Sequence, residues 1–264
     1  MNLDPHLRQL DDEGYTVLPG FLDPIVTAAI RDHLDQLSGP VLAADAAERP
    51  VHVHRHPIPG SIMAPLAWSP RLLDVAAAIL RAPNPDELEM LEQVLIRTDP
   101  SPGPYAVNGW HIDQAFRPEH FESTPRHTYF HMVHCCNTVP AGGGAFTILP
   151  GSHKKTYAAA ADLDTDEALD AFKADVVNRA RLDVSDYTQV NANEGDLLIF
   201  NPMCLHSASA NSTDQPRYVY FASFMHRDAK YLKGRLNAYG QKPVYPEGFE
   251  QQFPANRRHL VYRY

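Results

Sequence analysis

The sequence is short of positive charge. Its 264 residues include 23 Lys and Arg against 32 Asp and Glu, which gives a formal net charge of −9 at pH 7. Nucleic acids and anionic membrane surfaces bind proteins through clusters of basic residues. We therefore expect no nucleic-acid partner and no membrane partner for this chain.

Cysteine is also scarce, with three examples at Cys135, Cys136 and Cys204. The number is odd, two of them are adjacent, and no C-x-x-C spacing occurs. A disulfide scaffold or a structural zinc site would need more cysteines in other spacings. We therefore expect free thiols and a reducing, cytoplasmic location.

Long apolar runs are missing as well. The sequence has no stretch of about 18 consecutive apolar residues, which is the length that a membrane-spanning helix needs. The first residues are polar and acidic, and they lack the basic start and apolar centre of a signal peptide. The sequence predicts neither a membrane span nor a secretion signal.

One domain over residues 1–264 is expected, and its first part, from about 1 to 85, looks mainly helical. Asp23 and the proline after it mark a helix start, and apolar residues at helical spacing continue the helix to Leu37. A second helix is expected over Arg71–Leu80. We interpret this part as a helical support for the rest.

The pattern changes to short β-rich runs over residues 88–226. Gly, Pro and Asn turns separate these runs, which is typical of a sandwich or a barrel. A helical insert is expected over about 160–182, and an irregular tail over 227–264. The expected strands are Leu91–Arg97, Ala106–Asp113, Thr128–Thr138, Ala145–Leu149, Asp196–Phe200 and Tyr218–Met225.

The sequence contains 14 histidines, and one of them stands in a pattern typical of a metal site. In a strand, His111 and Asp113 would point to the same face, because side chains alternate. An imidazole and a carboxylate on one face are two-thirds of the triad that binds non-haem Fe(II). The alternative is an exposed polar strand or a buried His–Asp hydrogen bond.

A third ligand is expected from His206, which follows an apolar strand. Arg217 comes eleven residues later, and we expect the two to share one side of a hairpin. A cation buried beside a metal needs an anionic partner, since an unpaired buried charge is costly. A dicarboxylate co-substrate would supply it, because arginine binds a carboxylate through two parallel hydrogen bonds.

These features resemble the phytanoyl-CoA dioxygenase family of Fe(II)/2-oxoglutarate-dependent oxygenases. The resemblance implies a mainly β fold with flanking helices, built on a double-stranded β-helix (jelly-roll, cupin-like) core with iron at one mouth. The segments that carry it are Asp12–Phe21, Trp110–Asp113, Gly142–Lys154, and Glu194–Phe200 leading to His206 and Arg217.

The resemblance also implies roles for single residues. His111, Asp113 and His206 would bind Fe(II), and Arg217 would bind the C5 carboxylate of 2-oxoglutarate. Gln93 matches a position that faces the co-substrate or the substrate in some members. Some members have a serine two residues after the histidine that corresponds to His206, and this chain has Ala208 there. The sequence therefore does not identify which hydroxyl assists Arg217.

The implied reaction is hydroxylation of a small organic molecule, in which 2-oxoglutarate and O2 give succinate and CO2. Related halogenases have a small residue where this chain has Asp113, so the aspartate favours hydroxylation or another oxidation. The alternatives are a metal-dependent cupin-like hydrolase or isomerase and a non-catalytic binding barrel. Arg217 argues against hydrolysis, which needs no second anion, and the complete triad argues against a non-catalytic barrel.

Further residues are candidates for the substrate pocket. His131, Trp110 and Phe116 would line it, and the alternative for each is an ordinary core position. His153 is interpreted as a residue that fixes a loop. Cys204 is not expected to be a metal ligand, because an open thiolate would be oxidised there.

Two larger features have several interpretations. His52, His54 and His56 alternate in one run, which would place them on one face of a strand. They are interpreted as a solvated strand, as part of the substrate mouth or as a second metal site. The helical insert is either a solvated amphipathic segment or a lid over the active site.

Overall fold

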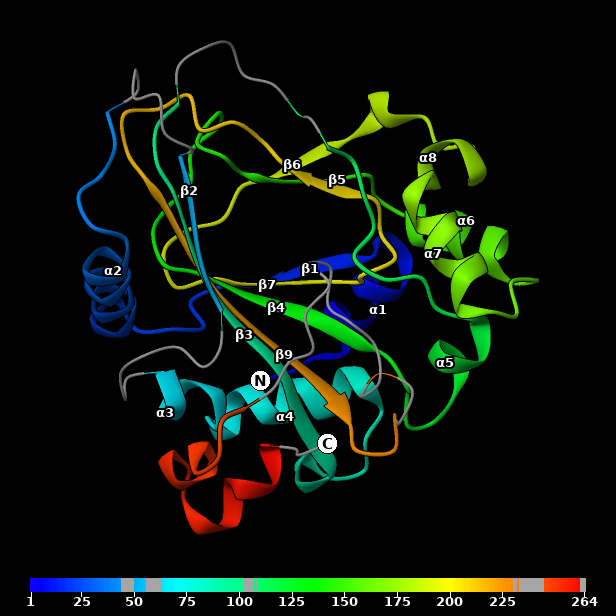
Figure 1. The fold of residues 1–264 in the computed structure, drawn as a ribbon, viewed down its shortest axis with the longest axis horizontal. Helices are drawn as coiled ribbons and strands as arrows, with labels where there is room; N and C mark the ends of the chain where they lie inside the picture. The colour runs from blue at the N-terminus through cyan, green and yellow to red at the C-terminus, as the bar shows by residue number, and fades with distance from the viewer. Residues whose placement is uncertain are drawn as a thin grey trace.

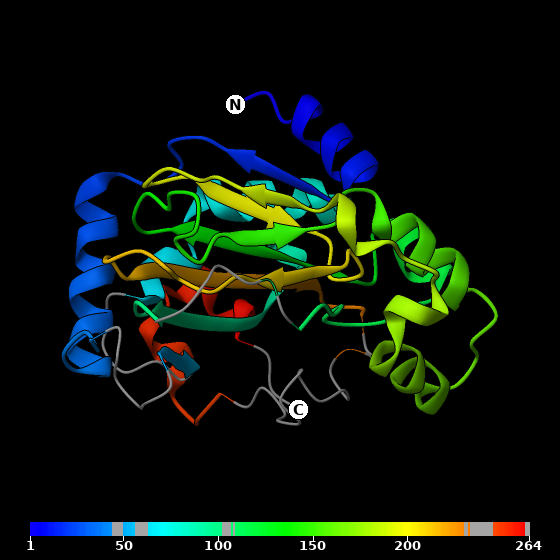
Figure 2. The same cartoon turned by 90° about the horizontal axis from the view of Figure 1, so that it is seen from above.

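Two antiparallel sheets face each other in the part of the chain that the structure describes (Figures 1 and 2). The computed structural model describes residues 1–43, 50–55, 63–101, 107, 109–229, 232 and 245–261. The larger sheet has the strand order β1-β7-β4-β9-β3-β2, and the smaller sheet has the order β6-β5-β8. This is the jelly roll with flanking helices that the sequence predicts. The strands are β1 Tyr15–Leu18, β2 Val51–Arg55, β3 Leu88–Thr98, β4 Tyr129–Cys135, β5 Phe146–Ile148, β6 Thr188–Val190, β7 Leu197–Phe200, β8 His206–Ala208 and β9 Arg217–His226.

The space between the sheets holds an apolar core. Val133 of β4, Leu198 of β7 and Val219 of β9 pack there with residues of the smaller sheet. Ile148 of β5 and Val190 of β6 complete this contact. Because side chains alternate along a strand, these residues identify which positions of each strand point between the sheets.

Helices cover the other face of the larger sheet: α1 Asp4–Glu13, α2 Pro24–Ser38, α3 Met63–Ala67 and α4 Pro70–Leu80. Leu73 and Ile79 of α4 are almost completely buried and pack in one cluster with Met90 and Leu95 of β3. Packing therefore closes this face of the sheet over β3.

Both predicted helices of the first part are confirmed. The Asp23 carboxylate accepts a hydrogen bond from the Ile25 amide at 2.9 Å, and α2 begins at Pro24. α4 ends at Leu80, and the residue that follows, Arg81, has a left-handed φ of 53°. The mainly helical interpretation missed β1, which pairs with β7. This strand is short and its partner lies far away in the sequence, so local patterns do not reveal it. β2, which pairs with β3, coincides with the histidine run for which the sequence suggested a strand.

Two expectations about strands are wrong. The run Ala106–Asp113 is not a regular strand in its described residues, where Val107 and His111 form isolated bridges. His206 and Arg217 do not lie on one hairpin, because β8 belongs to the smaller sheet and β9 to the larger one. The chain crosses between the sheets at a point where the sequence shows only a turn.

The helical insert lies between β5 and β6 and begins earlier than predicted (Figure 1). Its helices are α6 Ser152–Ala160, α7 Asp166–Ala174 and α8 Val176–Arg179, and the short α5 Pro118–Glu122 contacts α6. The 3-10 helices are η1 Pro85–Glu87, η2 Val184–Asp186, η3 Phe249–Gln252 and η4 Ala255–Leu260. The insert forms a helical layer at one end of the jelly roll.

One stretch of the described residues, Met63–Leu80, is long and apolar enough to cross a membrane by length and composition alone. It consists of α3 and α4, with a break at Trp68 and Ser69. Its apolar side chains belong to the core cluster beneath the larger sheet. We interpret it as part of that core.

Candidate metal centre

The loop that carries His111 is joined to the segment that carries His206 through the backbone. The amide of each histidine donates a hydrogen bond to the carbonyl of the other, both at 3.0 Å. Two residues further on, the Asp113 amide donates to the Pro202 carbonyl at 2.9 Å. These bonds bring His111, Asp113 and His206 together, with one ligand atom of each lying within 4.8 Å of the others.

Each histidine of this triad has a fixed ring orientation. Nδ1 of His111 donates to the Gly109 carbonyl at 2.7 Å, and Nδ1 of His206 donates to the Cys204 carbonyl at 2.9 Å. A carbonyl only accepts, so each Nδ1 carries a proton, and Nε2 is the ring atom that can bind a metal. The Nε2 atoms lie 3.7 and 3.2 Å from the Asp113 carboxylate. Such backbone contacts are the usual way in which proteins orient metal-binding imidazoles.

The protonation states suit a cation. Burial alone would raise the pKa of Asp113, but His206 and His131 lower it well below its ordinary value through charge and hydrogen bonds. Partial burial and the neighbouring His206 lower the pKa of His111. The triad therefore offers an ionised carboxylate and neutral imidazole, the forms that bind metals. The His111 side chain is 48% exposed, so the triad opens to solvent on that side.

Arg217 is the first residue of β9 and points between the sheets, on the same face as Val219. Its guanidinium donates to the Gly144 carbonyl at 2.6 Å and to the Thr98 hydroxyl at 3.3 Å. No carboxylate of the described residues pairs with it, its Nε is buried without a partner, and burial lowers its pKa. The site therefore holds a partly desolvated cation that lacks an anion.

The hydroxyl beside this arginine is that of Thr98, which sequence reasoning missed. Thr98 lies directly opposite Arg217 in the register of β3 and β9. Gln93 does not join them: five positions earlier on β3, it lies on the opposite face. Its amide donates to the Tyr220 hydroxyl at 2.7 Å and to the Met63 carbonyl at 3.2 Å. The expected contact of Gln93 with the co-substrate is therefore contradicted by its place in the helical layer.

The three pocket candidates lie in different surroundings. His131 of β4 is next to the triad, with Nε2 3.1 Å from the Asp113 carboxylate. Trp110 is half-buried and packs against Tyr187, with ring centroids 5.7 Å apart. Phe116 is completely buried in the main core, which is the alternative that the sequence left open for it.

The histidine run on β2 faces the helices rather than a substrate mouth. His52 Nε2 lies 3.0 Å from the Asp99 carboxylate, and His54 Nε2 lies 2.9 Å from the Ser38 hydroxyl of α2. These are contacts that fasten the strand, and neither residue belongs to the metal-competent group of the described residues. His56 lies outside the described residues. On the opposite face of β2, Val51, Val53 and Arg55 point to the interior side.

Two other residues occupy the positions expected of them. His153 of α6 contacts the Asp11 carbonyl of α1 at 3.2 Å, which fixes the start of the insert. Cys204 is buried against Ser152 and Leu149, and burial raises the pKa of its thiol to about 11. A neutral buried thiol is a poor metal ligand.

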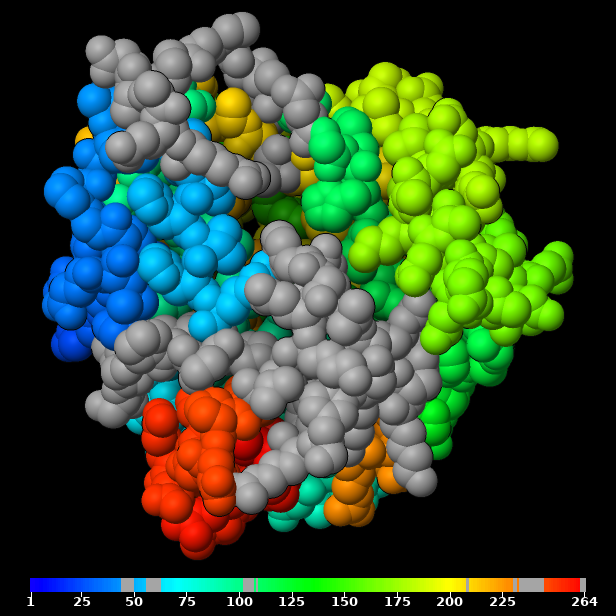
Figure 3. All heavy atoms as spheres, viewed as in Figure 1, coloured from blue at the N-terminus to red at the C-terminus, as the bar shows by residue number. Residues whose placement is uncertain are grey.

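The helical insert contacts the metal loop directly. Lys173 of α7 donates a hydrogen bond to the Asp113 carbonyl, and Tyr187 beyond α8 packs on Trp110. The molecule is hollowed between β2 and the segment of the metal loop, as Figure 3 shows. We infer that the insert forms one wall beside the triad.

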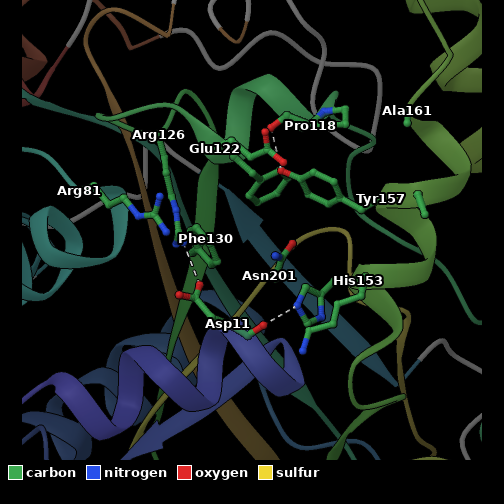
Figure 4. A pocket seen from close by; sticks show the side chains of 13 residues that line it. Asp11, Arg81, Pro118, Glu122, Arg126, Phe130, His153, Tyr157, Ala161 and Asn201 are labelled. Atoms are coloured by element: carbon green, nitrogen blue, oxygen red, sulfur yellow. Dashed lines mark hydrogen bonds and ion pairs between the residues drawn. The ribbon is translucent and has the colours of Figure 1, made fainter.

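A further hollow of about 580 Å³ lies elsewhere, between α1, α5 and α6 (Figure 4). Arg126 pairs there with the Asp11 carboxylate at 2.8 Å, beside Phe130 of β4. Phe130 alternates with His131, so this hollow lies across the sheet from the triad. The two sites are therefore separate.

Comparison with known proteins assigns the chain to a family. The phytanoyl-CoA dioxygenase (PhyH) family matches residues 10–219, a range that includes the triad and Arg217. The chain belongs to the phytanoyl-CoA dioxygenase family. No curated protein matches the sequence.

Several solved structures share the fold of this family member. An epimerase, SnoN, solved with Fe3+, alpha ketoglutarate and nogalamycin RO, is 21% identical, with a TM-score of 0.61 over 93% of this chain and 96% of that one. A carbocyclase from nogalamycin biosynthesis, SnoK, is 18% identical, with a TM-score of 0.61 over 92% and 94%. HygX from Streptomyces hygroscopicus, solved with nickel and 2-oxoglutarate, is 17% identical, with a TM-score of 0.58 over 85% and 87%.

Proposed function

We propose that this protein is an Fe(II)- and 2-oxoglutarate-dependent dioxygenase that hydroxylates a small organic molecule. The observation that carries the proposal is a His–Asp–His triad able to hold a metal, in the same jelly roll as an arginine that has no anionic partner among the described residues. The triad suits the metal, and the arginine suits a dicarboxylate.

The residues fit the implied metal. His111, Asp113 and His206 would hold Fe(II), because two imidazoles and one carboxylate leave positions open for other ligands. When bound, the iron would supply the activation of O2 that converts 2-oxoglutarate to succinate and CO2. The protein's own part is to orient the two imidazoles, because the Gly109 and Cys204 carbonyls hold Nδ1 of each ring and direct Nε2 toward the carboxylate.

The co-substrate would be held by its far carboxylate. Arg217 would bind that carboxylate, and the Thr98 hydroxyl, which accepts a hydrogen bond from Arg217, would donate one to the carboxylate. The pairing would neutralise a cation whose burial is otherwise unfavourable. The Gly144 carbonyl fixes the guanidinium in advance, which reduces the entropy lost on binding.

Hydroxylation is the outcome that Asp113 favours, since a carboxylate occupies the position that would otherwise admit a halide. The solved structures of this fold include an epimerase and a carbocyclase, so the product distinguishes hydroxylation from the other outcomes. The three cysteines are free and buried, which supports a reducing, cytoplasmic location.

The test measures succinate released from 2-oxoglutarate by the purified protein with Fe(II), ascorbate and O2, across a panel of small organic substrates. We expect turnover in the wild type, none in His111→Ala, and unchanged turnover in Arg258→Ala, which alters an exposed arginine of η4. Turnover that survives in His111→Ala would refute the proposal. A product with one added oxygen atom, detected by mass spectrometry with 18O2, identifies hydroxylation.

A further inference from the structure

A fourth histidine contacts the triad. Nε2 of His131 lies 3.1 Å from Asp113 Oδ2, the same oxygen that lies 3.2 Å from Nε2 of His206. In the described residues, His131 is nevertheless not part of the group whose ligand atoms lie mutually within 4.8 Å. His131 therefore contacts the carboxylate without sharing the space in which a metal would sit.

The other side of the His131 ring is also held. Nδ1 lies 2.9 Å from the Ser223 hydroxyl and 3.5 Å from the Glu92 carboxylate. The sheet register explains this row, because Glu92 of β3 is opposite Ser223 of β9, and Ser223 is opposite His131 of β4. Glu92, Ser223 and His131 therefore lie side by side on three adjacent strands, in a row that leads to Asp113.

A β-bulge lies directly beside this row. Met90 pairs with Phe224 and Glu92 pairs with Ser223, so Leu91 is an extra residue in β3. From Glu92 to Thr98 the register with β9 is regular, so the side chain of Glu92 points to the same face of the sheet as that of Thr98. The bulge changes the alternation only for Met90 and the residues before it.

Glu92 is fixed from a second direction. Arg55 of β2 lies 3.7 Å from its carboxylate, and the two side chains are only 18% and 13% exposed. Ser223 is completely buried. The row therefore begins at the edge strand β2 and ends at the triad, with each side chain held by the next.

The ring faces leave His131 little access to substrate. Phe200 lies 4.9 Å from it and Tyr129 5.0 Å, measured between ring centroids. Both ring nitrogens already have protein partners. The role in substrate contact that the sequence suggested for His131 is therefore not the one that its surroundings favour.

We propose that His131, held by Ser223 and Glu92, is a positioning residue that orients the Asp113 carboxylate for metal binding. This inference rests on the proposed function. A carboxylate ligand can rotate about its Cβ–Cγ bond, and a hydrogen bond to one oxygen limits that rotation. Loss of such an outer partner typically weakens metal binding by about 10- to 100-fold.

The experiment measures the affinity of the purified protein for Mn2+ and Co2+ by titration calorimetry, with the melting temperature as a check on folding. We expect His131→Phe to weaken metal binding by about 10- to 100-fold, Glu92→Gln to weaken it by less, and His131→Gln to restore part of the affinity through its amide donor. The matched control is His134→Phe, the same change on the same strand in a buried histidine of the opposite face. We expect the control to leave metal affinity unchanged.

The outcomes separate this inference from the proposed function. Wild-type protein that binds neither metal refutes both. Wild-type protein that binds metal, together with a folded His131→Phe variant of equal affinity, refutes only the positioning role. If His131→Phe does not fold, Ser223→Ala and Glu92→Gln decide, and unchanged affinity in both refutes the role. A Co2+ absorption spectrum that shows one ligand fewer in His131→Gln would make His131 a ligand and would also refute it.

Discussion

Replacing Arg217 by methionine should abolish tight binding of 2-oxoglutarate and leave metal binding intact. The guanidinium is the charged group of the site that has hydrogen-bond donors and no carboxylate partner among the described residues. Truncating one member of a buried, hydrogen-bonded charge pair costs about 2–5 kcal/mol. The dissociation constant for 2-oxoglutarate should therefore rise by about 30- to 4,000-fold.

The unliganded protein should respond differently. Arg217→Met removes hydrogen bonds to Gly144 and Thr98, each worth about 0.5–1.5 kcal/mol. It also removes a buried cation that pairs with no carboxylate in the described part of the chain, and the desolvation of such a cation costs several kcal/mol. These effects oppose each other, so the melting temperature of the unliganded variant should be unchanged or higher.

Thermal unfolding with Mn2+ present measures both effects without turnover. At a 2-oxoglutarate concentration of 100 times its wild-type dissociation constant, binding should raise the free energy of unfolding of the wild type by about 2.7 kcal/mol. For the variant, the increase should be about 0.9 kcal/mol or less. Arg258→Met is the control for loss of a surface arginine. A variant that binds 2-oxoglutarate as the wild type does, or that melts far lower without ligand, would show that Arg217 has a structural role instead.

Three further predictions concern other residues. Thr98→Val should weaken 2-oxoglutarate binding by about fivefold in calorimetry, because one hydrogen bond of about 1 kcal/mol is lost, and an equal affinity would exclude this contact. Burial lowers the pKa of His134 to about 3, so the unfolded chain takes up a proton there below about pH 6.5 that the folded protein does not. Stability should thus fall as the pH drops from 6.5 toward 3, and His134→Phe should show a shallower fall in urea unfolding; identical slopes would contradict this. Gly195→Ala should lower the free energy of unfolding by about 1–3 kcal/mol, because φ is 87° and the added carbon would lie 2.5 Å from the Leu22 carbonyl; an unchanged urea midpoint would refute this strain.

The triad could be predicted from the sequence, although alternation along a strand is not what brings His111 and Asp113 together. Residue types and spacing identified His111 and Asp113, but these residues do not lie on a regular strand. Backbone hydrogen bonds to Pro202 and His206 bring them together instead. A motif indicates which side chains a site needs. The groups that orient those side chains come from segments that are distant in the sequence.

The errors on β3 concern the face of the sheet on which each residue lies. The family resemblance places Gln93 at the site, whereas the pairing with β9 puts it on the helical face. Glu92 and Thr98 point to the inward face, and the sequence did not predict them as site residues. These positions depend on register with β9, which no local pattern specifies.

The backbone bridge between His111 and His206 has a consequence for amide hydrogen exchange. Two reciprocal amide–carbonyl bonds join the segments that carry both imidazole ligands. A metal bound to both imidazoles would hold these two segments together, so we expect an occupied site to slow the solvent exchange of the two amide hydrogens. The metal would thus stabilise a contact between chain segments that lie far apart in the sequence.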